Sequence, residues 1–290
     1  MMTDDSNTGE TGRISEFGRD GYVFDVLDSG RVRSGEVPGA DIPIVLLHGF
    51  PERAACWNLV TPILNERGYR TVAPDQRGYS PRARPAAVRD YRISELARDV
   101  IALADTLDAP KIHLVGHDWG SGVAWAVAAD YPDRVATLTA LAVPHPGAYL
   151  RAMPRGQLLR SWYMGVFQIP GFAEWALSKG MSNPRAARFG PPGFAEQLQT
   201  DIIDYGALTG GLNWYRALKY GDRGLMNRKV TVPTTHIWSD GDVYLSRAGA
   251  RGCAQMVDAP YDFIVLEGVD HWIPQRRPEQ VAEAILARIA

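Results

Sequence analysis

One pentapeptide, Gly116-His117-Asp118-Trp119-Gly120, places an ionisable side chain between two glycines. It follows the apolar run 112–115 and precedes a helix-like stretch. Because glycine has no Cβ, the pair lets a strand turn sharply into a helix and expose Asp118 at the turn. An aspartate is already ionised at neutral pH, so it can displace a leaving group at a saturated carbon without an activating base. That chemistry opens epoxides or removes halide, and it does not suit cleavage of peptides or simple esters.

This spacing resembles the nucleophile elbow of the α/β-hydrolases, most of which carry serine at the position of Asp118. The alternative is a strand–turn–helix junction with a capping aspartate. The family's chain order of nucleophile, acid and histidine favours catalysis, because suitable partners follow. Asp240 and Asp242 close a strand and are both candidate acids. Asp242 is preferred, because it sits where the loop leaves the strand toward the site. His271, between the last strand and the final helix, is the candidate general base.

The other five histidines fit structural roles better. His113 and His236 lie inside apolar runs, and His117 occupies the variable position of the elbow. His145 opens the irregular middle segment and could line a pocket, although a structural role is favoured. His48 is expected to brace a loop.

That loop, His48-Gly49-Phe50-Pro51, directly follows an apolar strand. Its chemical use would be to present a backbone N–H. The amides of Phe50 and Trp119 are expected to form an oxyanion hole at the Asp118 carboxyl. The Phe50–Pro51 bond is a candidate cis peptide. The alternative is an ordinary loop.

Short apolar runs alternate with helical patterns, which predicts an α/β fold with a mostly parallel sheet between two layers of helices. Strands are expected at 22–27, 43–47, 70–73, 112–115, 136–143, 234–238 and 263–266, and helices at 54–66, 93–107, 119–129 and 278–289. The alternation fails between Pro144 and Lys229, where aromatic helical pieces are broken by prolines. We therefore expect a polar tail over 1–19, an α/β-hydrolase core over 20–144 and 230–290, and an inserted helical cap over 145–229.

The elbow, the His-Gly-Phe-Pro loop and the Asp242/His271 pair together resemble the α/β-hydrolase epoxide hydrolases. The resemblance covers nearly the whole chain after the tail. It implies two cap tyrosines that hydrogen-bond the epoxide oxygen. Leu212-Asn213-Trp214-Tyr215-Arg216 is similar to the family's second tyrosine motif, and Ser161-Trp162-Tyr163 followed by Phe167-Gln168 resembles the first. Tyr163 and Tyr215 are thus the implied acids, with Tyr149 and Tyr205 as the alternatives.

The aromatic residues near these motifs carry further expectations. Phe50, Trp119 and Phe167 are expected to contact the substrate. Trp162, Trp175 and Trp214 are expected to form the core of the cap.

Composition restricts the partners. A net charge of −2 gives no sign of a nucleic-acid partner, and no run of about 18 apolar residues predicts a membrane span. The N-terminal stretch lacks the apolar segment of a signal peptide. Only Cys56 and Cys253 occur, far apart and outside any metal-binding spacing, which favours a reduced, cytoplasmic setting. Neither a cofactor nor a metal is expected.

The predicted activity is addition of water to an apolar epoxide through a covalent Asp118 ester, with a possible homodimer through the cap. A haloalkane dehalogenase is the first alternative, since it uses the same nucleophile. That family commonly has Asn where this chain has Phe50, and it lacks the tyrosine pair. A fluoroacetate dehalogenase would carry Arg in place of Trp119. A non-catalytic ligand-binding protein with this fold is a further alternative.

Overall fold

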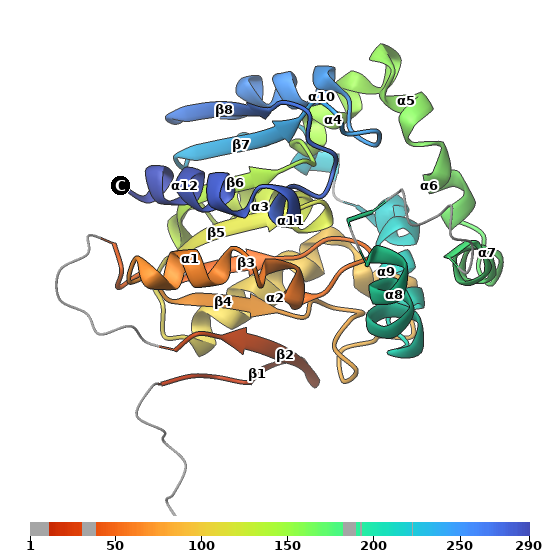
Figure 1. Cartoon of the computed structure of the whole chain (residues 1–290), viewed down its shortest axis with the longest axis horizontal. Helices are drawn as coiled ribbons and strands as arrows, with labels where there is room; N and C mark the ends of the chain where they lie inside the picture. Colours follow the sequence, from red (N-terminus) through yellow and green to blue (C-terminus); the bar gives the residue numbers. More distant parts are fainter. Residues whose placement is uncertain (1–11, 31–38, 182–189, 192, 222) are drawn as a thin grey trace, which may run out of the picture.

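The computed structural model describes residues 12–30, 39–181, 190–191, 193–221 and 223–290. Its strands form one sheet in the order β1-β2-β4-β3-β5-β6-β7-β8 (Figure 1). The strands are β1 (Glu16–Arg19), β2 (Tyr22–Asp28), β3 (Ile44–Leu47), β4 (Thr71–Pro74), β5 (Ile112–His117), β6 (Val135–Leu141), β7 (Thr234–Ser239) and β8 (Tyr261–Leu266). The β1–β2 and β2–β4 pairs are antiparallel and the other pairs are parallel, which confirms the predicted α/β class.

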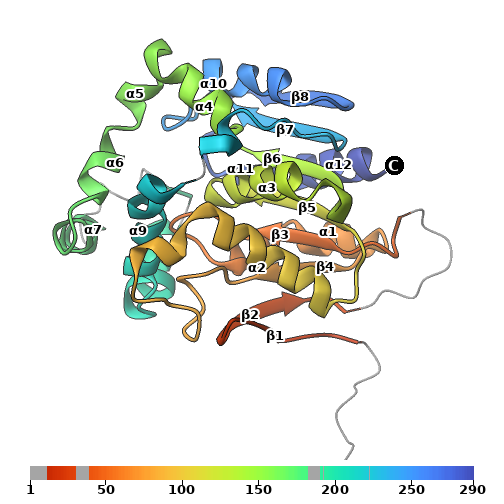
Figure 2. The ribbon, with the colours of Figure 1, turned by 180° about the vertical axis from the view of Figure 1, so that it is seen from behind.

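Helices cover both faces of this sheet (Figures 1 and 2). The helices of the core are α1 (Thr61–Glu66), α2 (Ile93–Thr106), α3 (Trp119–Asp130), α10 (Arg247–Gly252), α11 (Ile273–Arg276) and α12 (Pro278–Ile289). Side chains of β3 alternate between two hydrophobic cores: Val45 and Leu47 pack with α2 and α3, whereas Ile44 and Leu46 pack with α1 and α12. A strand buried on both faces needs a continuous apolar sequence, which is why this one is Ile-Val-Leu-Leu.

Two predicted elements differ from the structure for local reasons. The helix expected at 54–66 is divided into a short 3-10 helix, η1 (Ala54–Trp57), and α1. Pro62 cannot donate an N–H within a helix, so it is accommodated in the first turn of a new one. Strand β6 ends two residues earlier than expected, because Ala142 adopts a left-handed conformation with a φ of 65°.

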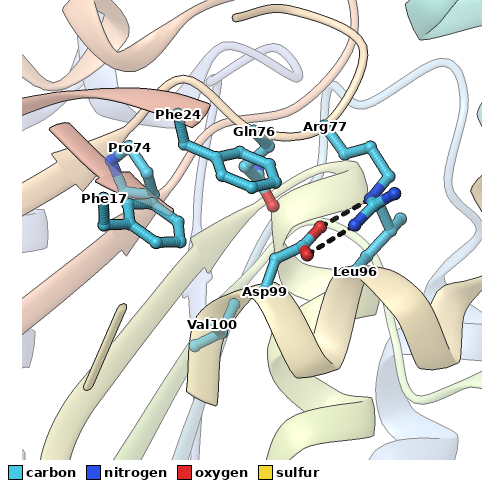
Figure 3. A pocket seen from close by; sticks show the side chains of 8 residues that line it. All are labelled: Phe17, Phe24, Pro74, Gln76, Arg77, Leu96, Asp99 and Val100. Atoms are coloured by element: carbon cyan, nitrogen blue, oxygen red, sulfur yellow. Dashed lines mark hydrogen bonds and ion pairs between the residues drawn. The ribbon is translucent and has the colours of Figure 1, made fainter. Parts of the chain in front are cut away.

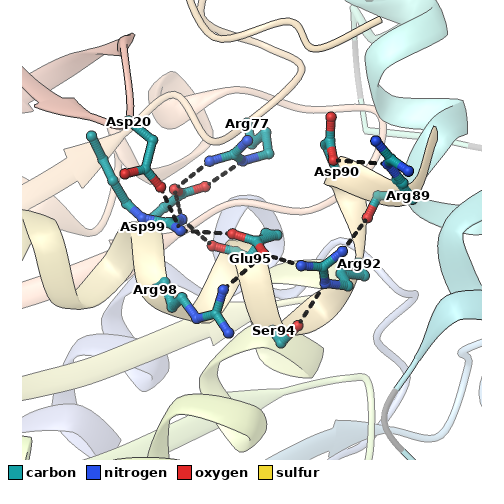
Figure 4. A network of polar contacts seen from close by, with 10 residues as sticks. Asp20, Arg77, Arg89, Asp90, Arg92, Ser94, Glu95, Arg98 and Asp99 are labelled. Carbon is teal, nitrogen blue, oxygen red and sulfur yellow. Dashed lines mark hydrogen bonds and ion pairs between the residues drawn. The ribbon is translucent and has the colours of Figure 1, made fainter. Parts of the chain in front are cut away.

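The expectation of a tail over 1–19 is wrong for its last residues, since residues 16–19 form β1. This strand pairs antiparallel with β2, and the ring of Phe17 stacks on that of Phe24. At its end, the Arg19 guanidinium reaches α2, where it donates to Glu95 at 2.6 Å and to Asp99 at 2.7 Å. Figure 4 shows these two acceptors, Glu95 and Asp99, on the helix. The polar sequence of residues 1–19 suggested a tail, but Arg19 has specific carboxylate partners, so this part of the segment belongs to the core.

The inserted segment between β6 and β7 is helical. Its helices are α4 (Pro146–Ala152), α5 (Gln157–Arg160), α6 (Trp162–Phe167), α7 (Phe172–Met181), α8 (Phe194–Gln197), the π-helix η6 (Leu198–Asp204) and α9 (Leu208–Arg216). Trp214 is 1% exposed, as expected of a core residue. The same expectation is wrong for Trp162 and Trp175, which are 71% and 58% exposed. None of the helices in the described ranges is long and apolar enough to cross a membrane.

A buried ion pair holds the loop after β4, and this loop contacts the insertion. Arg77, in the loop after β4, donates two hydrogen bonds of 2.7 Å to the carboxylate of Asp99 (Figure 3). The backbone carbonyl of Arg77 accepts a 2.7 Å hydrogen bond from the indole of Trp214 in α9. The loop held by this ion pair therefore also fixes the helix that carries Tyr215.

Replacing Asp99 with Asn should lower the free energy of unfolding by about 3–5 kcal/mol, because the buried Arg77 would lose its counter-charge. Urea unfolding at constant m-value measures this loss. Asp105→Asn is the matched control, since the Asp105 carboxylate pairs with Arg134 at 2.6 Å but is exposed. Its cost should stay within about 1 kcal/mol. Equal midpoint shifts for the two variants would contradict the structural importance of the buried pair.

Candidate active site

Asp118 occupies a strained turn between β5 and α3. Its φ of 51° and ψ of −122° are unusual for a residue with a side chain. The two flanking glycines permit this conformation through close backbone contacts. A Cβ on Gly116 would collide with the carbonyl of Gly120, and one on Gly120 would collide with the carbonyl of Leu47. The predicted elbow is therefore present, and it directs the Asp118 side chain beyond the end of β5.

The two carboxylate oxygens of Asp118 have different partners. Oδ1 accepts a 2.9 Å hydrogen bond from the Phe50 amide, and Oδ2 lies 3.3 Å from Nε2 of His271. Burial by itself raises the pKa of Asp118, but its hydrogen bond and charge interaction with His271 outweigh burial and lower it. Of the two amides predicted for the oxyanion hole, Phe50 donates to the carboxylate. Within the described residues, the Trp119 amide makes no hydrogen bond to this carboxylate.

His271 connects Asp118 to a second acid. Its Nδ1 lies 2.7 Å from Oδ2 of Asp242, a carboxylate that is fully buried. The other carboxylate oxygen of Asp242 accepts from the amides of Tyr244 and Leu245, so the acid is held by its own loop. Asp240, the alternative acid, instead accepts a hydrogen bond from the Gly268 amide and is exposed.

Asp270, next to His271 in the sequence, points away from the site and pairs with Arg276 at 2.8 Å.

The environment of His271 favours its charged form. Burial lowers the pKa of this imidazole, but the charge of Asp242 and the hydrogen bonds to Asp118 and Asp242 together raise it well above its usual value. The raised pKa favours the imidazolium form of His271 between the two carboxylates, where its positive charge balances part of the buried negative charge.

Asp118 also lines a cavity of about 350 Å³. Trp119, Tyr163 and Tyr215 contribute to the same wall, so the structure brings both predicted cap tyrosines to the predicted nucleophile. Burial raises the pKa of each phenol well above its usual value, and the charge of Asp118 acts in the same direction. The remainder of the lining is mostly apolar and includes Ile93, Val143, Leu150, Met153, Leu225 and Met226.

The two phenylalanines expected to touch substrate lie elsewhere. The rings of Phe50 and Phe167 pack against that of Tyr215, at centroid distances of 5.4 and 4.9 Å. Neither belongs to the described lining of the cavity. Their side chains support the tyrosine from behind, because edge-to-face packing already occupies their rings.

The alternative tyrosines have other partners. Tyr205 lies under Arg53, whose Cζ is 3.6 Å from the ring centre. Tyr149 does line the cavity, but its hydroxyl lies 2.6 Å from Oγ of Ser161.

The histidines expected to be structural have structural contacts. His48 braces two loops, since its Nε2 accepts from the Gln76 amide at 3.0 Å, and Phe50–Pro51 is cis as predicted. His145 accepts the Gly147 amide at 3.0 Å and so caps α4. His113 bonds Thr137 at 2.9 Å. His236 is buried within its strand.

A buried pair behind the nucleophile was not anticipated. Nε2 of His117 lies 2.9 Å from the backbone carbonyl of His271, and its Nδ1 lies 3.3 Å from Glu52. Glu52 also contacts the side-chain amide of Gln275. The sequence offered one signal for this role of Glu52: the residue directly follows the His-Gly-Phe-Pro loop, which was expected to lie beside Asp118.

Sequence comparison places this arrangement among known proteins. Residues 42–274 match the family described as the alpha/beta hydrolase fold. Epoxide hydrolase A of Mycobacterium tuberculosis is 34% identical, with 88% of this chain and 92% of that protein aligned. Epoxide hydrolase 3 of Xenopus tropicalis is 33% identical over 93% of this chain and 78% of its own length.

Solved structures agree. Epoxide Hydrolase A from Mycobacterium thermoresistibile superposes with a TM-score of 0.74 at 29% identity, covering 94% of this chain and 96% of that one. The epoxide hydrolase VrEH1 from Vigna radiata gives 0.75 at 28% identity, with the same coverage of 94% and 96%. With its sheet order, inserted helices and relatives agreeing, the chain belongs to the epoxide hydrolase family of the α/β-hydrolase fold.

Proposed function

We propose that this protein hydrolyses an apolar epoxide to a vicinal diol through a covalent ester on Asp118. One observation carries the proposal: an ionised carboxylate shares the wall of a largely apolar cavity with two protonated phenols, Tyr163 and Tyr215. A carboxylate supplies the nucleophile, and phenols supply what an epoxide requires, which is a proton donor for its oxygen. The wall offers no cationic side chain among its described residues, which suits an uncharged substrate.

In the first half-reaction, a carboxylate oxygen of Asp118 forms a bond to one epoxide carbon while the bond from that carbon to the ring oxygen breaks. The ring oxygen takes the electron pair and receives a proton from one of the two phenols. The other phenol hydrogen-bonds to it. An alkoxide is a poor leaving group without such donors, so Tyr163 and Tyr215 lower this barrier.

Between the two half-reactions, the proton held by His271 is transferred to the phenolate, which restores the phenol and leaves a neutral imidazole. In the second half-reaction, His271 removes a proton from water, and the resulting hydroxide attacks the ester carbonyl carbon of Asp118. The tetrahedral intermediate carries an oxyanion, which the Phe50 amide can stabilise from its position on Oδ1. The intermediate then collapses by breaking the bond between its central carbon and the substrate oxygen, which takes the proton of the added hydroxyl group. The diol leaves, and the carboxylate retains one oxygen from water. Asp242 stabilises the imidazolium that forms.

Esterification prepares His271 for this role. Two of the causes that raise its pKa are the charge of Asp118 and the hydrogen bond to Asp118, and an ester no longer carries that charge. The pKa of His271 is therefore lower in the ester than in the resting protein. The group becomes a base once a base is needed.

A haloalkane dehalogenase is the alternative function that shares this nucleophile. Halide needs weak donors and no proton, so the two phenols on the wall favour an epoxide. A purely ligand-binding role would not require a proton acceptor beside the Asp118 carboxylate, and the His271–Asp242 pair supplies one.

The first prediction concerns the source of the added oxygen. In a single turnover with excess enzyme in heavy-oxygen water, the diol should be mostly unlabelled, because its new oxygen comes from the Asp118 carboxylate. Mass spectrometry of the diol and of the peptide containing residue 118 measures both. Fully labelled diol in that first turnover would mean that water attacks the epoxide directly.

The second prediction concerns the phenols. Tyr163→Phe and Tyr215→Phe should each slow ester formation by roughly 10–10³-fold, and the double variant should nearly abolish it, with non-additive effects. Rapid-quench kinetics measure the step. Tyr205→Phe is the control, since that ring lies against Arg53. An active double variant would favour the dehalogenase alternative, which haloalkane turnover would then test.

The third prediction separates the two half-reactions. His271→Gln should consume about one equivalent of epoxide and stop, because Asp118 can attack unaided but the ester needs a base. Intact mass should rise by the whole mass of the substrate. Asp242→Asn should keep slow turnover. Because the charge of Asp242 raises the pKa of His271, this variant should also move the rising limb of the hydrolysis pH profile to lower pH. Normal turnover by His271→Gln would place the base elsewhere.

A further inference from the structure

A fully buried glutamine joins the cap to the loop of the catalytic acid. Gln157 is the first residue of α5 in the cap, and its buried side chain extends into the core. Nε2 donates to the backbone carbonyl of Tyr244 at 2.8 Å, and Oε1 accepts from the Ser246 amide at 2.8 Å. Both partners belong to the loop that follows Asp242. One amide side chain thus satisfies two backbone groups of that loop.

Arg160, at the other end of α5, makes a related contact. Its Nη1 donates to the backbone carbonyl of Asp242 at 2.6 Å. The arginine is exposed, so this bond is weaker support than the buried amide. Together the two side chains hold both ends of the segment 242–246.

The position of this segment decides where the Asp242 carboxylate lies. Oδ1 accepts the amides of Tyr244 and Leu245, which locks the carboxylate to its own loop, and Oδ2 faces His271. The ring of Tyr244 lies 5.1 Å from that of His271 and 5.7 Å from that of Tyr163. A displacement of the segment would therefore shift the acid relative to the base.

Gln157 is also connected to the helix of the first tyrosine. Its Nε2 lies 3.0 Å from Oγ of Ser161, the residue that immediately precedes α6 and its Tyr163. Ser161 in turn contacts the Tyr149 hydroxyl. The Gln157 side chain thereby links the start of α6, which carries Tyr163 for the first half-reaction, to the loop of Asp242, which serves the second.

We propose that Gln157, assisted by Arg160, is a positioning residue that docks the cap against the loop of Asp242 and so keeps that acid on His271. This inference rests on the proposed function for its kinetic consequence. It assigns to the cap a role in ester hydrolysis, in addition to binding the epoxide oxygen.

Loss of this positioning role should affect one half-reaction and spare the other. Attack by Asp118 does not use Asp242, so loss of the docking contact should spare ester formation. The titratable groups that face His271 are Asp118, Asp242, Tyr244 and His117. In the ester Asp118 is neutral, which leaves Asp242 as the carboxylate in contact with the base. Hydrolysis should therefore depend on the docking contact.

The test uses Gln157→Met and Arg160→Met in the full chain, with ester formation and ester hydrolysis timed separately. We expect hydrolysis to slow by about 10–100-fold in Gln157→Met, as for a small misplacement of a catalytic group, with ester accumulating. Arg160→Met should show a smaller change in the same direction. The rising limb of the hydrolysis pH profile should move to lower pH in both, because Asp242 would raise the pKa of His271 less. Unchanged hydrolysis and an unchanged limb would overturn the inference.

Arg84→Met is the matched control, because Nη2 of Arg84 joins core to cap by donating to the Tyr205 carbonyl at 3.0 Å, away from the acid loop. It should keep the wild-type ratio of the two rates. If the ratio of the hydrolysis rate to the ester-formation rate fell in Arg84→Met as much as in Gln157→Met, any loosening of the cap would explain the effect. That result would overturn the inference. If Gln157→Met does not fold, the exposed Arg160 still allows its variant to decide by the same ratio.

A measurement without substrate separates this inference from the proposed function. The proton between Nδ1 of His271 and Asp242 should give a downfield NMR resonance in the resting protein. We expect it to move upfield or broaden in Gln157→Met and to persist in Arg84→Met. The same resonance in all three proteins would overturn the docking role. A wild-type protein that forms no ester would overturn the proposed function alone.

Discussion

The site depends on the stabilisation of one buried anion. The Asp118 carboxylate is removed from water, which would ordinarily favour its neutral form. The Phe50 amide and the protonated His271 compensate this cost, and Asp242 in turn compensates the imidazolium. Each of these groups is therefore both a structural partner of the resting protein and a participant in the proposed reaction. Removing any one of them would leave a buried charge without its counterpart.

The parallel sheet brings these partners together. Asp118 follows β5, Phe50 follows β3, and Asp242 and His271 follow β7 and β8. Because neighbouring parallel strands end at one edge, groups up to 221 residues apart in sequence, from Phe50 to His271, meet in a single site. The ends of such strands are a common location for ligands in α/β folds. The cap then adds the two phenols from above this edge.

The sequence predicted the elements that carry their own local signals. Apolar runs located the parallel strands, and the glycine pair located the elbow. What it could not predict depends on distant partners. The polar segment containing β1 pairs with β2 and reaches carboxylates of α2 through Arg19. Trp162 is of a residue type common in protein cores, yet it is 71% exposed. Likewise, Glu52 and Gln157 look like ordinary polar residues until the fold places His117 and the acid loop beside them.

The hydrogen bond from the Trp214 indole to the Arg77 carbonyl constrains how a substrate can enter. Both groups are buried, and α9 is attached through them to the core and to α2. A cap that swung open as one rigid lid would break this bond and expose the Arg77–Asp99 pair to water. On the other side of the cap, Gln157 attaches α5 to the loop of Asp242. Because the cap is attached to the core on both sides, its geometry favours substrate entry without opening of the cap as a whole.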